Sequence, residues 1–417
     1  MSTLTGLVDI LLIVLVARVL GAACIRIHQP PVIGEMIGGI LLGPSLLGWM
    51  APELYRVLFP PSAVSLLGSL SQLGLVLFMF TIGANSHAHQ QGQVRRAGLI
   101  SAGSIVAPFG MGYGLGLLLA PAFSSSVPNP RLFSAFLGAA MSVTAFPVLA
   151  RILTDRGMLR TPLGALAIAC AAVDDVAAWL MLAAITAVAT GARHGAATWI
   201  LFAAWLLAMV LLVRPLARAI WRRSFDAQPE SPGALAFLIV VAIACGASTE
   251  WIGMHALFGA FFAGVMMPRN PKLTGVLSAK VEPLVSVLLL PLFFAYTGLR
   301  TNLGTMPLAN TAKWAVAIVA VAMAGKLGGA FIVARLTGVQ PRDAAILGLL
   351  MNTRGLVELV VLNVGLDLGI LPVNLFSIMV LMALLTTAMA SPGISIIRRW
   401  HPQEASDAAT SGFAPRE

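Results

Sequence analysis

Long apolar segments without charge alternate with short polar segments along the whole chain. A helix needs roughly 20 residues to cross the hydrocarbon core of a bilayer, and most of these apolar segments approach that length. When the chain is divided at charged residues, prolines and polar clusters, the pattern predicts thirteen helices, at 4–23, 32–47, 66–82, 99–119, 132–153, 163–188, 197–213, 234–247, 256–267, 284–299, 314–333, 344–364 and 375–390. We therefore expect an all-α polytopic membrane protein.

The eighth and ninth predicted helices are both short, and only residues 249–255 separate them. Irregular backbone is tolerated inside a membrane where protein covers it. Twelve spans with one re-entrant segment are therefore the alternative to thirteen spans.

The composition agrees with a membrane location. Hydrophobic residues make up 59% of the 417 residues and charged residues only 10%, whereas soluble domains carry about 25% charged residues. The three cysteines stand singly in apolar segments, without the spacing of a metal site or a disulfide framework. These features exclude an ordinary soluble enzyme, and we expect neither enzymatic activity nor a cofactor.

The net charge of +10 reflects the loops between the predicted spans. With an outer N-terminus and thirteen spans, the inner loops and tail hold eighteen Lys and Arg residues and the outer loops hold five. Lys and Arg gather on the cytoplasmic side of membrane proteins. This distribution predicts a multi-pass protein of the cell membrane (inner or plasma), with its N-terminus outside and residues 400–417 as a short cytoplasmic tail without a regulatory domain. It gives no reason to expect a nucleic-acid partner, because the charges form no single polar face.

Charged residues interrupt the apolar pattern well inside several of the predicted spans. Among them are Glu35, Asp174, Asp175, Lys326, Arg354 and Glu358. A charged side chain at a helix centre costs roughly 2.5–3.5 kcal/mol if it is unpaired. These side chains must therefore be paired, hydrated or functional.

Asp174 and Asp175 are neighbours in the middle of the sixth predicted span. Adjacent helical positions point about 100° apart, so one carboxylate can face a water-filled cavity while the other faces a basic partner. Lys326 is the lone lysine inside a span and is the natural partner for one of them. The alternative is a buried ion pair that only fixes helix packing.

Arg354 and Glu358 lie four residues apart on the twelfth predicted span. Helical side chains at this spacing meet. The two residues can satisfy each other for structural reasons alone, or they can take part in function, and the sequence leaves both readings open.

Two spans carry polar interruptions. In the fifth, Ser142 and Thr144 precede Pro147, which removes a helical hydrogen bond and frees a carbonyl. In the twelfth, a polar segment from Asn352 to Gly355 interrupts an apolar run at the corresponding place of the second half. Helices broken at matching places in two halves point to a transporter's midplane site, where freed carbonyls coordinate cations. Ordinary kinks are the alternative.

Five stretches carry a resemblance to a known family. They are PVIGEMIGGILLGPSLLG at 31–48, SVTAFPVLARIL at 142–153, AAVDDVAAW at 171–179, PLFFAYTGLRTNL at 291–303 and NTRGLVELVVLNVG at 352–365. On these stretches the chain resembles the monovalent cation:proton antiporter-2 family of the sodium/hydrogen exchanger superfamily. Within it, the chain is most similar to the branch that includes the plant cation/H⁺ exchangers.

The resemblance implies the sodium/proton antiporter fold. This fold has inverted repeats, a domain that forms a homodimer, and a core domain in which two broken helices cross beside an aspartate. It implies one transmembrane domain over 1–399, with a first repeat at about 4–188, a linker helix at about 197–213 and a second repeat at about 234–397. The crossing helices would be the fifth and twelfth predicted spans.

The resemblance also implies roles for single residues. Asp175 matches the acid that binds cation and proton alternately. Asp174 matches a position that is Asp in electrogenic members and Asn or Gln in others, and Lys326 matches its basic partner. Arg354 matches a basic residue beside the second helix break. Relatives of the plant branch often carry Asn before the essential acid, so Asp174 is a departure that bears on ion stoichiometry.

We expect a secondary antiporter that exchanges Na⁺ or K⁺ for protons by alternating access, electrogenically. A hard cation prefers oxygen ligands, which Asp175, Asp174, Thr144 and freed carbonyls of the fifth span can supply. The alternatives are a channel-like or ligand-sensing membrane protein of the same fold and an exporter of a small ionisable metabolite. The choice between Na⁺ and K⁺ stays open, because selectivity depends on cavity size and hydration.

Overall fold

The computed structural model describes residues 3–85, 94–123, 127, 129–159, 161–189, 195–252, 255–268, 270–302 and 308–400. All regular structure in these ranges is helical. Residues 401–417, which make up nearly all of the predicted tail, lie outside them.

Ten helical segments of the described chain are long and apolar enough to cross a membrane. They are Gly6–Arg26, Pro31–Met50, Pro61–Asn85, Arg95–Phe123, Pro162–Ala189, Ile200–Phe225, Pro232–Ile252, Pro271–Leu299, Ala312–Leu336 and Val373–Arg399. Two shorter helices, α18 (Pro341–Met351) and α19 (Leu356–Asp367), are bent by 42° at their junction and make an eleventh candidate if they count as one span.

Two of the thirteen predicted spans account for the difference. The fifth is divided into α7 (Pro130–Ser142) and α8 (Phe146–Asp155), because residues 143–145 are not helical. The ninth is α13 (Ala256–Met266), which has only 11 residues. The eighth, α12 (Pro232–Ile252), is a full-length candidate span. Of the two helices that the sequence left uncertain, only the ninth is therefore short.

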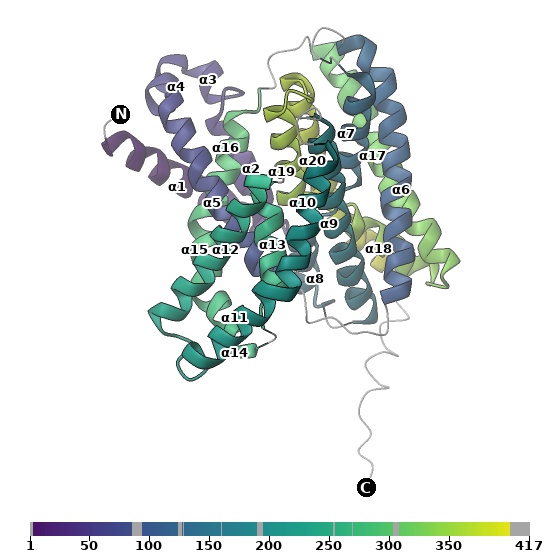
Figure 1. Cartoon of the computed structure of the whole chain (residues 1–417). Helices are drawn as coiled ribbons and strands as arrows, with labels where there is room; N and C mark the ends of the chain where they lie inside the picture. Colours follow the sequence, from purple (N-terminus) through teal and green to yellow (C-terminus); the bar gives the residue numbers. More distant parts are fainter. Residues whose placement is uncertain are drawn as a thin grey trace.

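The helices form two bundles, which lie side by side in Figure 1. We call the first the scaffold bundle; it contains α12, α13, α1 (Thr3–Arg26), α2 (Pro31–Leu42), α5 (Pro61–Asn85) and α16 (Leu290–Leu299). We call the second the core bundle; it contains α7, α8, α18, α19, α6 (Val94–Leu119), α9 (Pro162–Ala189), α17 (Leu308–Leu336) and α20 (Val373–Trp400).

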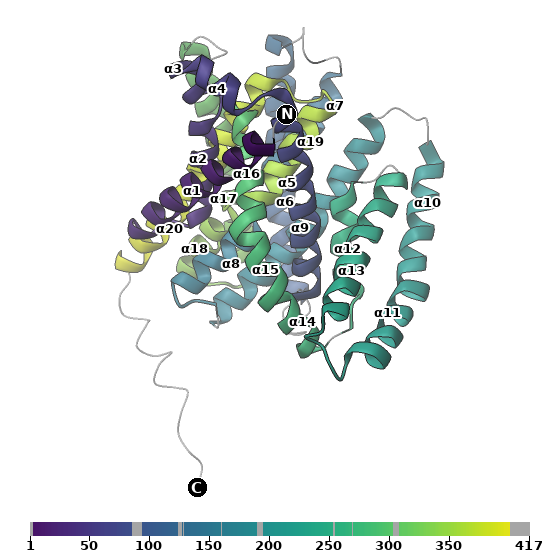
Figure 2. The ribbon, with the colours of Figure 1, turned by 90° about the vertical axis from the view of Figure 1, so that its left-hand side faces the viewer.

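Shorter helices complete the scaffold side. The helices α3 (Leu47–Met50) and α4 (Pro52–Leu58) connect α2 to α5. The helices α14 (Pro271–Val276) and α15 (Glu282–Leu284) lead into α16. The predicted linker helix is α10 (Gly195–Ala208), which continues through a π-helical turn into α11 (Arg214–Ile220) and lies at the edge of the molecule beside α12 in Figure 2.

The core bundle consists of two units with the same order of elements. Each has a long helix, a broken pair and a second long helix: α6 to α9 in one unit and α17 to α20 in the other. The units run in opposite directions, because Arg96 near the start of α6 donates a hydrogen bond from Nε to the carbonyl of Thr337, just beyond the end of α17, at 3.1 Å. The two breaks therefore meet within the bundle.

Glycines bring α2 and α16 into direct backbone contact inside the scaffold bundle. A Cβ atom at Gly298 would lie 2.0 Å from the carbonyl carbon of Gly39, and one at Gly43 would lie 2.4 Å from the carbonyl oxygen of Gly298. These distances leave no room for any side chain, so a larger residue would force the two helices apart.

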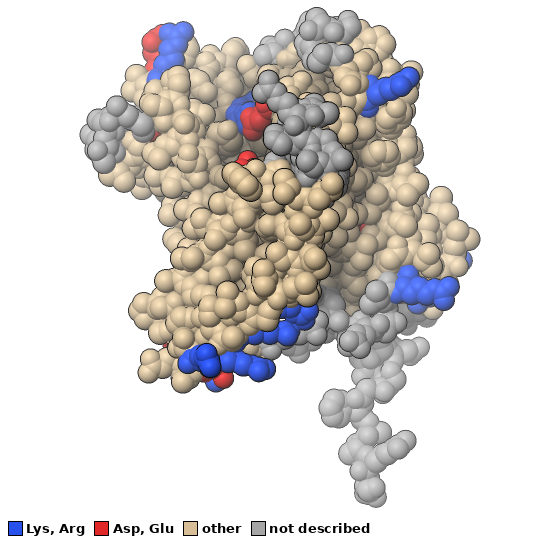
Figure 3. Space-filling view, in the orientation of Figure 1, with Lys and Arg blue, Asp and Glu red and all other residues tan. Residues whose placement is uncertain are grey.

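The outer surface is that of a protein surrounded by lipid. In Figure 3, Lys and Arg side chains lie near the upper and lower edges of the face shown, and the described atoms between these edges are almost all uncharged. Large apolar side chains on peripheral helices point outward, such as Leu11 with an exposed fraction of 68% and Leu212 with 66%. A bilayer would cover such side chains.

Candidate functional site

The two helix breaks pack against each other at the centre of the core bundle. The backbone N–H of Ala145 donates a hydrogen bond to the carbonyl of Thr353 at 2.9 Å. The hydroxyl of Thr144 lies 2.9 Å from the carbonyl oxygen of Met351, the last residue of α18. Because α7 and α18 both end here, the negative ends of two helix dipoles meet in the bundle interior.

Pro147 lies in the first turn of α8. A proline is tolerated there because the first N–H groups of a helix have no partner within it. It cannot donate to the carbonyl of Val143, four residues earlier. The break before α8 therefore follows the local sequence.

Two buried cations satisfy the carbonyls at the end of α7. The guanidinium of Arg354 donates to the carbonyls of Ala140, at 3.2 Å, and Met141, at 2.7 Å. The ammonium of Lys326 donates to the carbonyl of Ser142. The last three carbonyls of α7, directly before Val143, thus accept hydrogen bonds from the protein's own side chains.

Asp174 on α9 is the counter-ion of Lys326. Its Oδ2 lies 2.8 Å from Nζ of the lysine, and both side chains are fully buried. The same oxygen accepts hydrogen bonds from Thr144 Oγ1 at 2.7 Å and Ser104 Oγ at 3.2 Å, while Ser101 donates to Oδ1. The carboxylate of Asp174 is therefore saturated with donors, and Thr144 belongs to its shell.

Arg354 forms a second buried pair. Its NH1 lies 3.1 Å from Glu358 Oε1, one helical turn further along α19, and both side chains have no exposed area. Thr387 of α20 fixes the backbone of Arg354: the N–H of Arg354 donates to Thr387 Oγ1 at 2.8 Å, and the hydroxyl donates to the Arg354 carbonyl at 2.7 Å. The two pairs together contain two positive and two negative charges, so they are neutral as a group.

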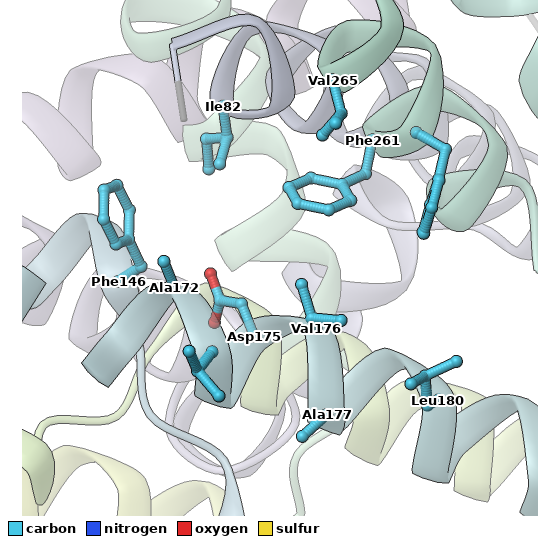
Figure 4. A pocket seen from close by; sticks show the side chains of 11 residues that line it. Ile82, Phe146, Ala172, Asp175, Val176, Ala177, Leu180, Phe261 and Val265 are labelled. Carbon is cyan, nitrogen blue, oxygen red and sulfur yellow. The ribbon is translucent and has the colours of Figure 1, made fainter. Parts of the chain in front are cut away.

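Asp175 stands apart from these pairs. Its side chain lines a cavity of about 600 Å³ between α5, α8, α9 and α13, and in Figure 4 the carboxylate points into the space between Phe146, Ile82 and Phe261. Its Oδ1 accepts no hydrogen bond from the described part of the chain. Asp175 is also the single ionisable residue among the described residues that line the cavity, which are Ile82, Phe146, Ala172, Val173, Asp175, Val176, Ala177, Leu180, Phe261, Phe262 and Val265.

The other predicted residues lie at the crossing or away from it. Asn352 follows α18 as its C-cap and has a buried side chain, whose Oδ1 has no hydrogen-bond partner within the described ranges. Gly355 precedes α19, and a Cβ there would lie 2.9 Å from Val148 Cγ2 of α8. Ser142 turns its hydroxyl to the Gly138 carbonyl, at 2.8 Å. Glu35 lies on α2 in the scaffold bundle.

Sequence reasoning missed the hydroxyl shell of Asp174 on α6. Ser101 and Ser104 are three residues apart, on one face of an otherwise apolar helix, and both are fully buried. That spacing was the available signal, because a helical face with two hydroxyls in a span needs a polar partner. Nothing in the sequence indicated that Phe261 and Phe262 of α13 would line the cavity at Asp175.

A family model described as "Sodium/hydrogen exchanger, transmembrane" matches residues 11–400. The chain belongs to the sodium/hydrogen exchanger family. This confirms the resemblance that the five stretches indicated, and it places the chain among transporters rather than enzymes.

Curated members of the sodium/hydrogen exchanger family include close relatives. The chain is 42% identical to the Na⁺/H⁺ antiporter NhaS4 of Synechocystis sp., over 93% of this chain and 95% of the relative. It is 39% identical to cation/H⁺ antiporter 18 of Arabidopsis thaliana and 31% identical to K⁺/H⁺ antiporter 1 of Saccharomyces cerevisiae, over 94% and 91% of this chain. The chain spans about half the length of these plant and yeast relatives, 49% and 45% respectively.

The fold of the family is also found in a solved structure. The sodium/proton antiporter MjNhaP1 of Methanocaldococcus jannaschii matches with a TM-score of 0.59 over 96% of this chain and 97% of that one, at 12% identity. The expected sodium/proton antiporter fold is thereby confirmed.

Lys326→Met is expected to destabilise the protein by about 3–5 kcal/mol, because Asp174 then stays buried without a cation. Adding Asp174→Asn should recover most of this loss, since no uncompensated charge is left. Thermal unfolding in detergent measures both effects, with Lys313→Met at an exposed position as the control. Equal losses in the single and the double variant would show that the pair is not coupled.

Proposed function

We propose that this protein is a secondary antiporter that exchanges a monovalent cation, Na⁺ or K⁺, for protons. The observation that carries the proposal is Asp175, a carboxylate without a hydrogen-bond partner at Oδ1 among the described residues, in a cavity that they line with no other ionisable side chain. The names of the relatives support it, because they are Na⁺/H⁺, K⁺/H⁺ and cation/H⁺ antiporters.

The exchange follows from competition for one carboxylate. Asp175 holds either a proton, in a covalent O–H bond, or a cation, through its oxygen atoms, but not both. A hard cation needs further oxygen ligands, and water in the cavity supplies them next to the apolar lining. Thr144 and Asp174, which we expected as direct ligands, are hydrogen-bonded to each other. In this mechanism they stabilise the surroundings of Asp175 and do not bind the cation themselves. When Asp175 releases one of the two ions on one side of the membrane, it becomes free to bind the other ion from that side.

Alternating access is proposed to come from movement of the core bundle against the scaffold bundle. The cavity lies along their boundary, since α8 and α9 belong to the core bundle and α5 and α13 to the scaffold bundle. Its lining includes Ile82 near the end of α5 and Val265 near the end of α13. With the N-terminus outside, both helices end at the cytoplasmic side, so the cavity belongs to a state open to the cytoplasm.

The wider assembly is part of the proposal. We assign the protein to the cell membrane with its C-terminus in the cytoplasm, as a homodimer that associates through the scaffold bundle. The repeats are assigned to about 4–188 and 234–397, with the linker helix between them. The asymmetry of Lys and Arg between loops supports the orientation.

Asp175→Asn is expected to abolish exchange for Li⁺, Na⁺, K⁺ and Rb⁺ alike, because an amide neither releases a proton nor balances a cation. The measurement is the collapse of a preformed pH gradient in everted vesicles when each cation is added. Glu53→Gln, at an exposed position on α4, is the matched acid-to-amide control. Robust exchange by Asp175→Asn would contradict the mechanism, and a wild type that never responds would favour a sensor or an exporter of a metabolite.

The apparent KM for the cation is expected to rise as pH falls. A proton on Asp175 blocks the cation, so at pH values below the pKa of the site the KM should increase by up to about tenfold per unit of pH. Initial rates over a range of Na⁺ concentrations at several pH values test this. A KM that stays constant over the whole active range would point to separate sites for the two ions.

Exchange is expected to be electrogenic, with more protons than cations moved in each cycle. The Asp174–Lys326 pair places two further ionisable side chains beside Asp175, and one net charge couples to the membrane potential at about 2.3 kcal/mol per 100 mV. Proteoliposomes with a valinomycin-imposed K⁺ potential and Na⁺ as the transported ion measure the effect. Asp174→Asn should weaken the voltage dependence. Identical wild-type rates with and without the potential would leave the pair a purely structural role.

A further inference from the structure

A group of polar side chains joins the two bundles at the end of their boundary that lies opposite the Asp175 cavity. Thr297 and Arg300 belong to the last turn of α16 and its cap, in the scaffold bundle, whereas Asn363 and Asp367 lie near the end of α19, in the core bundle. We call these four residues the outer clamp.

Arg300 makes the main connection. Its NH1 donates to Asn363 Oδ1 at 3.0 Å, and its NH2 forms an ion pair with Asp367. Asn363 returns a hydrogen bond from Nδ2 to Thr297 Oγ1 at 3.0 Å. The guanidinium also lies 5.3 Å from the ring centre of Tyr296, which orients it. Each bundle thus contributes both a donor and an acceptor to the outer clamp.

The burial of the outer clamp is uneven. The side chain of Arg300 has an exposed fraction of 19%, while that of Asp367 has 59%. Water therefore reaches one partner of the ion pair. An ion pair with one exposed partner can hold the two bundles together. Breaking it costs only a modest free energy, because water can replace its hydrogen bonds.

The space between the two bundles is small at the outer clamp and larger at the end that contains Asp175. At the outer clamp, the described residues line a hollow of about 100 Å³ between the bundles, which Gly68, Ser71, Gln72 and Leu75 border from α5. Near the other end of α5, at Ile82, the cavity of about 600 Å³ reaches Asp175. The backbones of α16 and α19 make few close contacts, so side chains rather than interlocked helices close this end.

We propose that the outer clamp is the gate that holds the transporter in the state with the Asp175 cavity open, and that it must open before Asp175 can face the opposite side. This rests on the proposed function, because a gate matters only if access alternates. Weakening the outer clamp should shift the population away from the state with the cavity open. A mutation can shift the equilibrium between the two states only if it changes their difference in free energy. The bonds of the outer clamp are present in one state and broken in the other, so removing them changes that difference.

The test measures access to the cavity without relying on transport. Val265, which lines the cavity, is replaced by cysteine in a chain whose Cys24, Cys170 and Cys245 are replaced by alanine. An impermeant maleimide is applied from the side to which the cavity opens. Arg300→Gln and Asp367→Asn are each expected to slow labelling several-fold relative to the same chain with an intact outer clamp. Glu53→Gln, which breaks an exposed ion pair within α4, should leave the labelling rate unchanged.

A charge exchange provides the second variant. Arg300→Asp and Asp367→Arg should each slow labelling, and the double variant should restore it, because the ion pair is rebuilt in the opposite sense. Unchanged labelling in folded Arg300→Gln and Asp367→Asn, or no recovery in the double variant, would overturn the gate. Labelling and cation exchange are both measured on everted vesicles that contain the same variant. A wild type that labels as expected but exchanges no cation would contradict the proposed function and leave the gate standing.

Discussion

A helix that ends in the middle of a membrane leaves its last carbonyls without partners, and no water is at hand to satisfy them. In this protein α7 ends at Ser142, and the carbonyls of Ala140, Met141 and Ser142 accept hydrogen bonds from Arg354 and Lys326. The other buried charges follow from this arrangement. Each cation needs a counter-ion in the low dielectric of the bundle, and Glu358 and Asp174 fill these roles.

With these four charges paired, Asp175 is the carboxylate in the cavity that is left to bind an ion. A proton and a monovalent cation both carry one positive charge, so either of them neutralises Asp175, and the additional proton of the proposed electrogenic cycle would be carried by the Asp174–Lys326 pair. An empty Asp175 would instead bring an uncompensated negative charge into an apolar cavity, at a considerable desolvation cost. In the proposed mechanism, this cost keeps the unloaded core bundle from crossing and so couples the two ion flows.

The sequence allowed much of the fold to be predicted, because spanning helices must be long and apolar and because charges inside them stand out. The helix break after Ser142 could be predicted from Pro147, and the spacing of Arg354 and Glu358 indicated their pairing. The pairing of Lys326 with an aspartate on another helix could also be predicted, because Lys326 is the lone lysine inside a span, but the other partners that come from neighbouring helices could not. The hydroxyls of Ser101 and Ser104, the Arg354 bonds to α7 and the turn of Thr144 toward Asp174 depend on helix packing. Periodicity along one helix does not report such packing.

The crossing of Gly39 and Gly298 has a consequence for how the molecule responds to its surroundings. This contact contains no rotatable side chain, so it has no alternative rotamer to adopt and no side-chain entropy to gain on warming. Rotamer changes on warming therefore do not alter the closest approach of α2 and α16, which is set by backbone atoms. A rearrangement at this contact would require the two helices to slide or separate as whole elements, because no side chain is present there that could repack.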